Sequence, residues 1–269
     1  MSDVYLFGHP IAHSLSPAMH NAAFRSLSLP HCYVVRDVDA AQLSDAIARL
    51  RSEDALGANV TIPHKEAAVR LVDETSDEVR ATGALNTIVR RGSRLAAANT
   101  DVDGFRASLV AGGRELLDHG TVLVLGAGGA ARACVYALLQ RDVEVLVANR
   151  SAERLESLAR SLEFHGRRPR VVPWPRVAEA IRIDGVVNAT PLGMQGEDPL
   201  DGIALPPVVV DIVPTTAETP LVKRARATEN VTVVDGLAML LHQAARSFEL
   251  WTGVPAPLEV MRAALPRPA

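Results

Sequence analysis

A glycine-rich turn between an apolar run and a helical stretch constrains this chain most. Residues Val122 to Leu125 form a short apolar run without charge, which is typical of a strand buried on both faces. The letters G-A-G-G-A-A follow, so that Gly126, Gly128 and Ala131 match the spacing G-x-G-x-x-A. A helix and a second apolar strand, V-E-V-L-V-A, are expected next. This strand–turn–helix–strand order predicts a Rossmann-type, doubly wound α/β domain that binds a dinucleotide.

Each small residue of the turn has a separate physical task. Gly126 permits the tight turn, Gly128 lets the backbone approach a pyrophosphate, and Ala131 lets the helix pack against the strand. The N–H groups and the positive dipole of the helix N-terminus then face the phosphates. The predicted phosphate-binding segment consists of Gly126, Ala127, Gly128, Gly129 and Ala130.

The end of the second strand selects between the two common nicotinamide cofactors. NAD-specific sites usually carry Asp or Glu there, which accepts hydrogen bonds from the ribose 2′-OH. This chain has Asn149, Arg150 and Ser151 instead, with Arg154 one helical turn further on. Guanidinium groups bind a 2′-phosphate that a carboxylate would repel. We therefore expect NADP; alternatively, Ser151 caps the next helix and both arginines are solvated, and capping by Ser151 is compatible with a phosphate clamp.

Composition narrows the classes of protein further. The 269 residues are 48% hydrophobic and 22% charged, which suits one large or two ordinary folded domains. Lys and Arg number 28 against 31 Asp and Glu, so the charge balance favours neither nucleic acid nor an anionic membrane as a partner. We expect small-molecule partners, a monomer or homodimer, and a cytoplasmic location in which Cys32 and Cys134 are reduced core residues.

Polar residues in the first hundred positions suggest a binding site. Ser14 and Ser16 flank one leucine, so both hydroxyls face one way in an extended segment and suit a carboxylate or a hydroxylated ring. Ser16 is equally suited to cap the helix that Pro17 opens. Asn59 and Thr61 alternate with apolar residues, so in a strand they share a face and mark a pocket rim, or else a half-exposed edge strand.

Two charged residues follow strand ends. Lys65 lies near the start of a helix, where its charge opposes the helix dipole, so local stability does not explain it; a surface lysine is the alternative. Asp101 closes N-T-D before a helix, where capping is an equal possibility. His13 and His64 are eligible bases by type, but neither has a partner at metal-ligand spacing, so no metal is expected.

Taken together, these stretches resemble the shikimate dehydrogenase family. The resemblance is carried by H-S-L-S, N-V-T-I-P-H-K-E, G-A-L-N-T and N-T-D-V-D-G before the glycine turn, and by N-A-T-P-L-G-M, D-G-L-A-M-L and H-Q-A after it. It implies two α/β domains. One is a split substrate domain of residues 1–101 plus 237–269, and the other is an NADP-binding Rossmann domain of residues 102–236.

The resemblance also implies residue roles. Lys65 and Asp101 match the catalytic pair, while Ser14 and Ser16 match the residues that bind the shikimate carboxylate. The remaining substrate contacts are expected from Asn59, Thr61, Asn86, Asp101 and Gln243. The remaining cofactor contacts are expected from Asn149, Arg150, Ser151, Arg154, Thr190, Gly236 and Met239.

The implied reaction is the reversible, NADP-dependent reduction of 3-dehydroshikimate to shikimate in aromatic amino-acid biosynthesis. Two positions depart from the family pattern: Pro214 stands where a tyrosine is common, and Ala97 where a glycine is usual. Loss of the tyrosine hydroxyl keeps open a paralogue that acts on quinate or a related polyhydroxy acid. The Tyr-x-x-x-Lys mechanism of other dehydrogenases is excluded, because Tyr5, Tyr33 and Tyr136 are followed four residues later by His, Asp and Gln.

Overall fold

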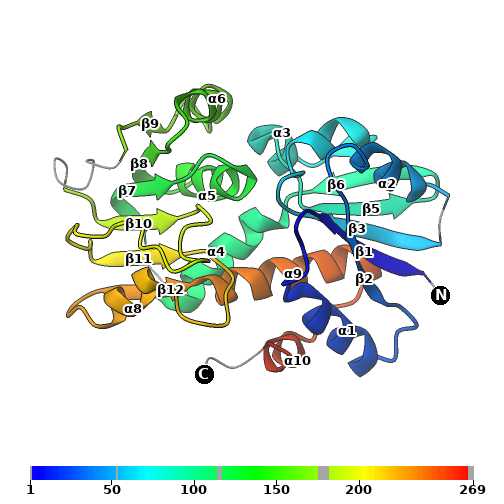
Figure 1. Cartoon of the computed structure of the whole chain (residues 1–269). Coiled ribbons are helices and arrows are strands. Elements are labelled where there is room, and N and C mark those ends of the chain that lie inside the picture. Colours follow the sequence, from blue (N-terminus) through cyan, green and yellow to red (C-terminus); the bar gives the residue numbers. More distant parts are fainter. Residues whose placement is uncertain (1, 53, 114–116, 175–181, 266–269) are drawn as a thin grey trace. The chain divides into compact units, whose positions relative to one another are not determined.

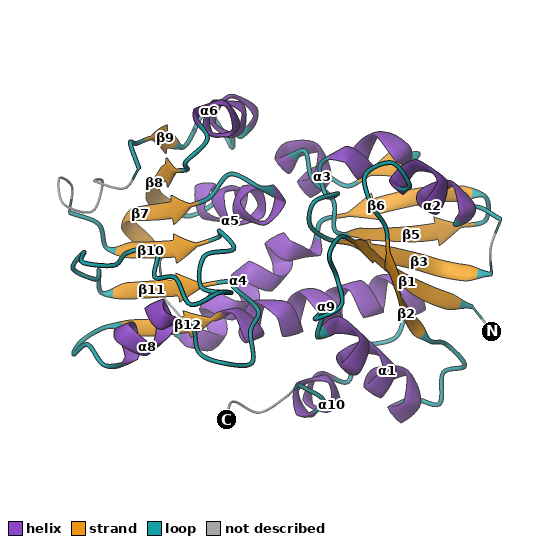
Figure 2. Cartoon of the chain, in the orientation of Figure 1, coloured by secondary structure: helices purple, strands orange, loops and turns teal. Residues whose placement is uncertain are grey.

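The computed structural model describes residues 2–52, 54–113, 117–174 and 182–265 (Figure 1). The chain divides into two compact units. The substrate unit contains the described residues up to Gly104 and from Leu241 on, and the cofactor unit contains Phe105–Leu240. Each unit is built on its own six-stranded sheet, with helices beside it (Figure 2).

The sheet of the substrate unit is mixed. Its order is β2-β1-β3-β5-β6-β4, with β1, β2 and β3 parallel and with β5 antiparallel to both β3 and β6. The strands are β1 (Asp3–Gly8), β2 (Tyr33–Asp37), β3 (Ala55–Val60), β4 (Glu74–Thr75), β5 (Thr87–Arg91) and β6 (Arg94–Ala98). The hairpin of β5 and β6 was predicted from Gly92-Ser93, and Gly92 indeed adopts a positive φ of 64°. The short strand β4 was not predicted.

Apolar side chains of this sheet form a closed core with the helices. Phe7, Ile47, Leu85 and Ile88 are fully buried in one cluster. Helix α9 (Gly236–Thr252) is bonded to the sheet by Trp251, whose indole N–H donates to the Ile88 carbonyl at 2.9 Å. The other helical segments are α1 (Ser16–Ser26), α2 (Leu43–Arg49), the 3₁₀ helix η1 (Ala67–Leu71), α3 (Asp77–Thr82) and α10 (Leu258–Ala263). Two helices cross the boundary between the units: α4 (Thr100–Gly112) and α9 (Gly236–Thr252).

The sheet of the cofactor unit is parallel throughout. Its order is β12-β11-β10-β7-β8-β9, the doubly wound arrangement in which the chain starts in the middle and builds outward on both sides. The strands are β7 (His119–Leu125), β8 (Asp142–Ala148), β9 (Arg170–Val171), β10 (Gly185–Asn188), β11 (Val208–Asp211) and β12 (Thr232–Asp235). The helices are α5 (Gly129–Leu139), α6 (Ala152–Ser161) and α8 (Pro220–Arg226). The predicted Rossmann fold is confirmed.

The register of this sheet brings its functional ends level with one another. Leu125 pairs with Asn188 and with Ala148, and Asn188 pairs with Asp211, which pairs with Asp235. The carboxyl ends of five strands therefore meet along one edge, where α/β sheets bind their ligands. Val122 to Leu125 are fully or almost fully buried, as the uncharged run predicted.

Two further observations concern the whole chain. Cys134 is buried as expected, but Cys32 is exposed, so the expectation that both cysteines lie in the core is wrong for Cys32. It lies just before β2 in a surface loop, where propensity alone does not decide burial. Among the described helices, none combines the length and the apolarity that crossing a bilayer requires.

Candidate active site

A buried ion pair joins Lys65 to Asp101. Lys65 Nζ lies 2.5 Å from Asp101 Oδ2, and the side chains are only 14% and 5% exposed. Lys65 lies in the turn between β3 and η1, and its carbonyl accepts a hydrogen bond from Leu85 N–H at 2.9 Å. A lysine that is fixed at both its backbone and its ammonium group is not a solvated surface residue. The fold thus brings the two predicted catalytic side chains, Lys65 and Asp101, into direct contact.

Asp101 does not cap its helix. Helix α4 begins at Thr100, so Asp101 lies within its first turn. The capping bond comes from Asn99, whose side-chain oxygen accepts the Asp101 N–H at 3.2 Å. The alternative that Asp101 serves as an N-cap is therefore wrong, and both of its carboxylate oxygens are available for other partners. Sequence alone could not separate three consecutive residues that all suit a helix start.

Asn86 orients the second carboxylate oxygen. Its side-chain oxygen accepts the backbone N–H of Thr100 at 2.8 Å, which fixes which end of the amide is the donor. The Nδ2 group therefore points to Asp101 Oδ1, at 2.9 Å, and to Gln243 Oε1, at 3.1 Å. Asp101 thus accepts from Lys65 with one oxygen and from Asn86 with the other, as an ionised carboxylate does.

The same cluster includes Gln243 of α9. Its Oε1 is occupied by Asn86 Nδ2, and its side chain is 9% exposed. Four predicted site residues consequently form one connected group: the catalytic candidates Lys65 and Asp101, and the substrate-binding candidates Asn86 and Gln243. They come from four separate stretches of the chain. The group combines a cation, an anion and amides, which are the donors and acceptors that suit ring hydroxyls.

The two serines lie on the loop after β1. The backbone N–H of Ser16 donates to Ser14 Oγ at 3.3 Å, so the two serines are adjacent. Helix α1 begins at Ser16 itself, its N-cap position is Leu15, and no side chain caps it. The expectation that Ser16 caps α1 is wrong, because Pro17 occupies one of the first positions and sets the start one residue earlier.

Backbone hydrogen bonds join the serine loop to the segment after β3. Thr61 N–H donates to the Phe7 carbonyl at 2.9 Å, and His9 N–H donates to the Ile62 carbonyl at 3.1 Å. Gly8 makes this approach possible, because a Cβ there would lie 2.5 Å from Thr61 Cγ2. Thr61 is half-buried and lies just past the strand end, beside the loop that carries Ser14 and Ser16.

Asn59 is a buried residue of strand β3. Strand β3 lies in the middle of the sheet, so the edge-strand alternative is wrong. Asn59 is 6% exposed; its Nδ2 donates to the Asn86 carbonyl at 2.9 Å, and its Oδ1 accepts from the Tyr33 hydroxyl at 2.7 Å. Further contacts to Thr87 and Ser247 occupy the remaining donor capacity. These bonds hold Asn59 within the fold, and its contact with substrate stays a prediction.

An aromatic stack surrounds Tyr33. The His20 ring lies 4.4 Å from the Tyr33 ring, and Trp251 packs 5.3 Å from His20. Burial raises the pKa of Tyr33, against a smaller opposing effect of its hydrogen bond with the Ser16 side chain. Burial lowers the pKa of His20 to about 3, and neither of its ring nitrogens has a hydrogen-bond partner. His20 is therefore neutral, and its role is packing.

The glycine turn of the cofactor unit has the geometry that the sequence predicted. Gly126 has φ of 116°, and a Cβ there would lie 2.7 Å from the Ala189 carbonyl oxygen. A Cβ on Gly128, in contrast, would meet nothing within 4 Å, so open space adjoins this backbone. Gly128 is the N-cap of α5, and no side chain caps the helix. Ala131 is fully buried against the sheet.

The loop after β8 presents two arginines. Ser151 caps α6 by accepting the Arg154 N–H at 3.3 Å, and Asn149 Nδ2 donates to the Ser151 carbonyl at 3.1 Å. The capping expectation for Ser151 is confirmed, and the side chains of Arg150 and Arg154 remain free of it. Within the described residues, neither arginine makes an ion pair with a carboxylate, whereas nearby Arg160 and Arg170 do.

Three more predicted cofactor residues lie in or beside this unit's ligand edge. Thr190 Oγ1 donates to Asn188 Oδ1 at 2.7 Å, and this bond fixes the loop after β10. Gly236 starts α9, where a Cβ would lie 2.3 Å from the Val213 carbonyl oxygen. Met239, on α9, is 6% exposed. Gly236 therefore has a packing role against the loop after β11, in addition to any ligand contact.

Asp211 organises the loops at the same edge. Its carboxylate accepts from Thr219 Oγ1 at 2.6 Å, Asn188 Nδ2 at 3.0 Å and Val213 N–H at 3.1 Å. Burial raises the pKa of Asp211, and these three hydrogen bonds oppose the rise. Pro214, the departure from the family pattern, is exposed just beyond this network and leaves it intact.

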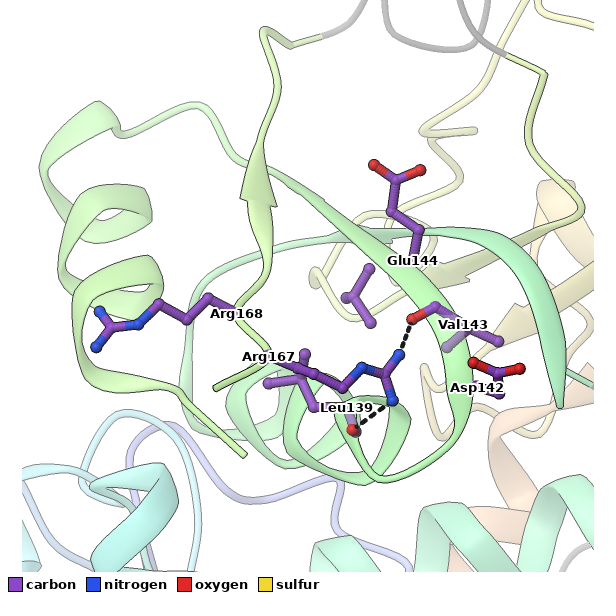
Figure 3. A pocket seen from close by; sticks show the side chains of 7 residues that line it. Leu139, Asp142, Val143, Glu144, Arg167 and Arg168 are labelled. Atoms are coloured by element: carbon purple, nitrogen blue, oxygen red, sulfur yellow. Dashed lines mark hydrogen bonds between the residues drawn. The ribbon is translucent and has the colours of Figure 1, made fainter. Parts of the chain in front are cut away.

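A surface hollow in the cofactor unit lies at the opposite edge of the sheet (Figure 3). Its volume is about 360 Å³, and it is lined by Leu139, Asp142, Val143, Glu144, Val145, Arg167 and Arg168. Arg167 points inward, where it donates to the carbonyls of Arg141 and Val143 and, at 2.9 Å, to that of Leu139 at the end of α5. The Arg167 guanidinium thus caps the C-terminus of α5, so its role in this hollow is structural.

Sequence reasoning missed three residues beside the cluster. Thr87, Thr100 and Ser247 are buried hydroxyls that bond to one another, and the two threonines also bond to Asn86. A signal was present, since each threonine adjoins a predicted site residue in G-A-L-N-T and N-T-D.

Among the described residues, no group of three or more His, Cys, Asp and Glu side chains is placed to hold a metal. His64 is buried, and its Nε2 donates to the Val38 carbonyl at 2.6 Å.

A Rossmann unit with an uncapped phosphate-binding turn, in one chain with a buried lysine–aspartate pair, defines a nicotinamide-dependent dehydrogenase. Family models agree across the chain. The shikimate dehydrogenase substrate-binding domain matches residues 6–88, shikimate/quinate 5-dehydrogenase matches residues 110–191, and the shikimate 5′-dehydrogenase C-terminal domain matches residues 236–265. The chain belongs to the shikimate dehydrogenase family.

Individual relatives are similar over nearly their whole length. A shikimate dehydrogenase (NADP(+)) of Salinibacter ruber is 44% identical over 94% of this chain and 93% of its own. Shikimate 5-dehydrogenase of Thermus thermophilus, solved in complex with NADP(H) and shikimate, is 37% identical with a TM-score of 0.84 over 98% of both chains. The ligand-free 5-ketofructose reductase of a Gluconobacter strain is 29% identical with a TM-score of 0.82, over 98% of this chain and 97% of its own. The fold therefore also serves a reductase with another named substrate.

Proposed function

We propose that Lys65 and Asp101 carry the proton transfer of an NADP-dependent shikimate dehydrogenase. The activity itself follows from the family and from relatives named for it: the chain is an oxidoreductase that interconverts 3-dehydroshikimate and shikimate with NADP. The observation that supports the residue assignment is the buried ion pair, 2.5 Å long and joined to Asn86 and Gln243. Ion pairs of this burial are costly to maintain, which favours a functional reason for this one.

The residues of the cofactor unit fit NADP. Open space beside Gly128 leaves room for a pyrophosphate, and α5 offers N-terminal N–H groups that no side chain caps. Arg150 and Arg154 form no close ion pair among the described residues, although Arg150 interacts electrostatically with Glu197, and we infer that both are available to a 2′-phosphate. We assign these four features to cofactor binding, with Asn149, Ser151 and Thr190 shaping the surrounding loops.

The bound cofactor supplies the hydride chemistry. In the reducing direction, the Lys65 ammonium donates its proton to the carbonyl oxygen of the substrate as that oxygen gains negative charge. Asp101 holds the ammonium in place through Oδ2, and Asn86 fixes the carboxylate through Oδ1. In the oxidising direction, Lys65 takes the proton back. Fixing these groups before the substrate binds removes the entropy cost of assembling them during the reaction.

Ser14, Ser16 and Thr61 complete the proposed substrate site. Two serine hydroxyls beside each other suit a carboxylate, and the backbone bonds after β1 and β3 hold Thr61 next to their loop. Gln243, whose side-chain oxygen accepts from Asn86, lies in the same cluster, and we assign it to a ring hydroxyl of the substrate.

The decisive assay measures NADP⁺ reduction with shikimate and with quinate side by side. We expect a higher kcat/KM for shikimate. Activity with quinate alone would assign the chain to the alternative substrate, and activity with neither would refute the proposed site. Pro214 makes quinate worth measuring, because it removes the tyrosine that is common at that position.

We further propose that the enzyme acts in the cytoplasm as a monomer or homodimer. The proposed catalytic cluster is complete within one chain, which supports activity without a partner subunit. Cys32 and Cys134 are both thiols outside any disulfide, as suits a reducing compartment. Light scattering after gel filtration tests the assembly, and fractionation of cells tests the location.

A further inference from the structure

Three buried hydroxyls stand directly behind the catalytic cluster. Thr87 Oγ1 lies 2.8 Å from Ser247 Oγ, Thr100 Oγ1 lies 2.9 Å from it, and the two threonine oxygens are 3.3 Å apart. The exposed fractions of the three residues are 0%, 1% and 0%. We call Thr87, Thr100 and Ser247 the hydroxyl triad.

Each member of the triad is covalently close to one residue of the proposed site. Thr87 follows Asn86, Thr100 precedes Asp101, and Ser247 lies one helical turn after Gln243. The triad therefore fastens together the start of β5, the start of α4 and the C-terminal part of α9. Asn86 lies directly before β5, Asp101 lies in α4, and Gln243 lies in α9.

The hydrogen-bond directions leave the triad no spare proton. Ser247 Oγ donates to the Gln243 carbonyl at 3.0 Å, since a carbonyl only accepts, so the Ser247 oxygen is an acceptor toward the threonines. Thr87 and Thr100 each have one hydroxyl proton, for which Ser247 Oγ and Asn86 Oδ1 are the acceptors. Every hydroxyl proton is used inside the fold. A network of this kind fixes positions and does not transfer protons to a ligand.

We propose that the hydroxyl triad is the positioning device of the active site, with Ser247 as the residue that registers α9, and hence Gln243, against Asn86 and Asp101. This inference rests on the proposed function of those residues. Thr87, Thr100 and Ser247 are positioning residues, because they act through the cluster and do not touch the reacting atoms. Displacing catalytic groups by about 1 Å costs up to 10²-fold in rate, so the triad matters even though it is hidden.

The test removes single hydroxyl groups while keeping side-chain shape. Thr87→Val, Thr100→Val and Ser247→Ala are each expected to lower kcat for shikimate oxidation by roughly tenfold, a fraction of the 10²-fold limit for misplacement. The KM for NADP⁺ is expected to stay unchanged. The matched control is Thr252→Val, also on α9, whose hydroxyl bonds to the Phe248 carbonyl at 2.8 Å and to the Val254 backbone but not to the cluster.

Two further measurements separate positioning from general stability. Thr100→Ser keeps the hydroxyl and loses the methyl group, so it should retain kcat where Thr100→Val loses it. In a double-mutant cycle, Ser247→Ala should add little to the kcat loss of Gln243→Ala, because Ser247 acts by placing Gln243. Melting curves accompany every variant, and Thr100→Ser keeps the test informative if Thr100→Val does not fold.

The outcomes are distinct. A kcat for Ser247→Ala equal to that of Thr252→Val would overturn the triad, as would a Thr100→Ser variant that is worse than Thr100→Val. A wild-type enzyme without NADP-dependent oxidation of shikimate would instead overturn the proposed function. Wild-type activity with unaffected triad variants would leave the function standing and remove only the positioning role.

Discussion

The two units prepare for their ligands in opposite ways. In the substrate unit, side chains meet and satisfy one another: Lys65 is paired with Asp101, and Asn86 is held by Thr100. In the cofactor unit, the predicted site depends on open space and on charges that no close ion pair occupies. Gly128 has no side chain where space is needed, and Arg150 forms no close ion pair within the described residues.

This difference follows from what each unit must recognise. A ring with several hydroxyls offers directional donors and acceptors, so its site gains from groups that are already aimed. A pyrophosphate and a 2′-phosphate offer concentrated charge, which exposed N–H groups and mobile guanidinium groups can meet without prior alignment. A substitution in the first site should therefore chiefly affect kcat or the KM for shikimate, and one in the second should chiefly affect cofactor affinity.

The largest expected effect is at the ion pair. Lys65→Met and Asp101→Asn should each lower kcat by about 10²–10⁴-fold, the usual contribution of a positioned proton-transfer group. Because the two residues act as a unit, the double variant should be little worse than the worse single one. Steady-state kinetics of shikimate oxidation with melting curves measure this. A folded Lys65→Met enzyme with near-normal kcat would end the proposal.

The glycine turn should respond to a single added methyl group. Gly128→Ala fits the ligand-free fold but fills the space for the pyrophosphate, so the Kd for NADP⁺ should rise by roughly 100-fold, as when one or two charged hydrogen bonds are lost. The melting temperature should not fall. Gly126→Ala is the contrast, because φ of 116° and the nearby Ala189 carbonyl strain it, so this variant should lose thermal stability. Equal melting temperatures would contradict the distinction.

The arginines test the choice of cofactor. Arg150→Asp replaces an attractive charge with a repulsive one, so the Kd for NADP⁺ should rise by about 10- to 100-fold while NAD⁺ binding changes little. Calorimetry with both cofactors measures the ratio. Equal losses for NADP⁺ and NAD⁺ would mean that Arg150 is structural, and Arg160→Asp, on the same unit but paired with Glu156, is the control.

A smaller effect is expected at the serine loop. Ser14→Ala and Ser16→Ala should each raise the KM for shikimate by about tenfold, as when a hydrogen bond to a charged group is lost, and should leave the Kd for NADP⁺ unchanged. Neither variant should lose a helix cap, because Leu15 holds that position. A shikimate KM that stays at the wild-type value in both would remove the carboxylate assignment.

The smallest effect concerns stability against pH and has opposite signs in the two units. The pKa of His20 falls from 6.5 when unfolded to about 3 when folded, so the unfolded chain binds the extra proton between these values. The substrate unit should therefore lose about 1–2 kcal/mol as the pH falls from 6.5 to 5, at roughly 1.4 kcal/mol per pH unit. His20→Phe should abolish this loss in denaturant titrations.

Asp211 gives the opposite contribution. Its folded pKa is raised, so its share of stability is fully present below the unfolded pKa near 3.8 and is lost as the pH rises through the folded pKa. Asp211→Asn should flatten that dependence in the cofactor unit. Unchanged pH profiles in both His20→Phe and Asp211→Asn would show that neither buried group governs the acid response.

Much of the fold was predictable because strong periodic signals and turn residues agreed. The run Val122–Leu125, the glycine turn and the hairpin at Gly92 each combine a local preference with a tertiary role, so sequence and structure coincide. The short strand β4 has two residues and no pattern of its own. It exists only because β6 lies beside it, which no local reading can detect.

The site was predictable to the extent that its residue types were unusual for their positions. Lys65 opposed a helix dipole and therefore stood out, whereas Asp101, Asn99 and Thr100 all suit a helix start and could not be separated. The burial of Asn59 could not be predicted, because alternation along a strand identifies a face but does not tell whether that face is a pocket or an interior. Ser247 could not be predicted from the sequence, because the side chains to which it bonds lie 147 to 188 residues away.

The division of the chain has a consequence for how the enzyme comes into being. The cofactor unit, Phe105–Leu240, interrupts the substrate unit, whose remaining residues begin only at Leu241. During translation, domains fold as units when their residues have emerged from the ribosome. The later-started unit is therefore complete first, while the earlier one waits for Gln243, Ser247 and Trp251. A nascent chain can thus gain the fold that binds its coenzyme before the place for the acid it oxidises has been closed.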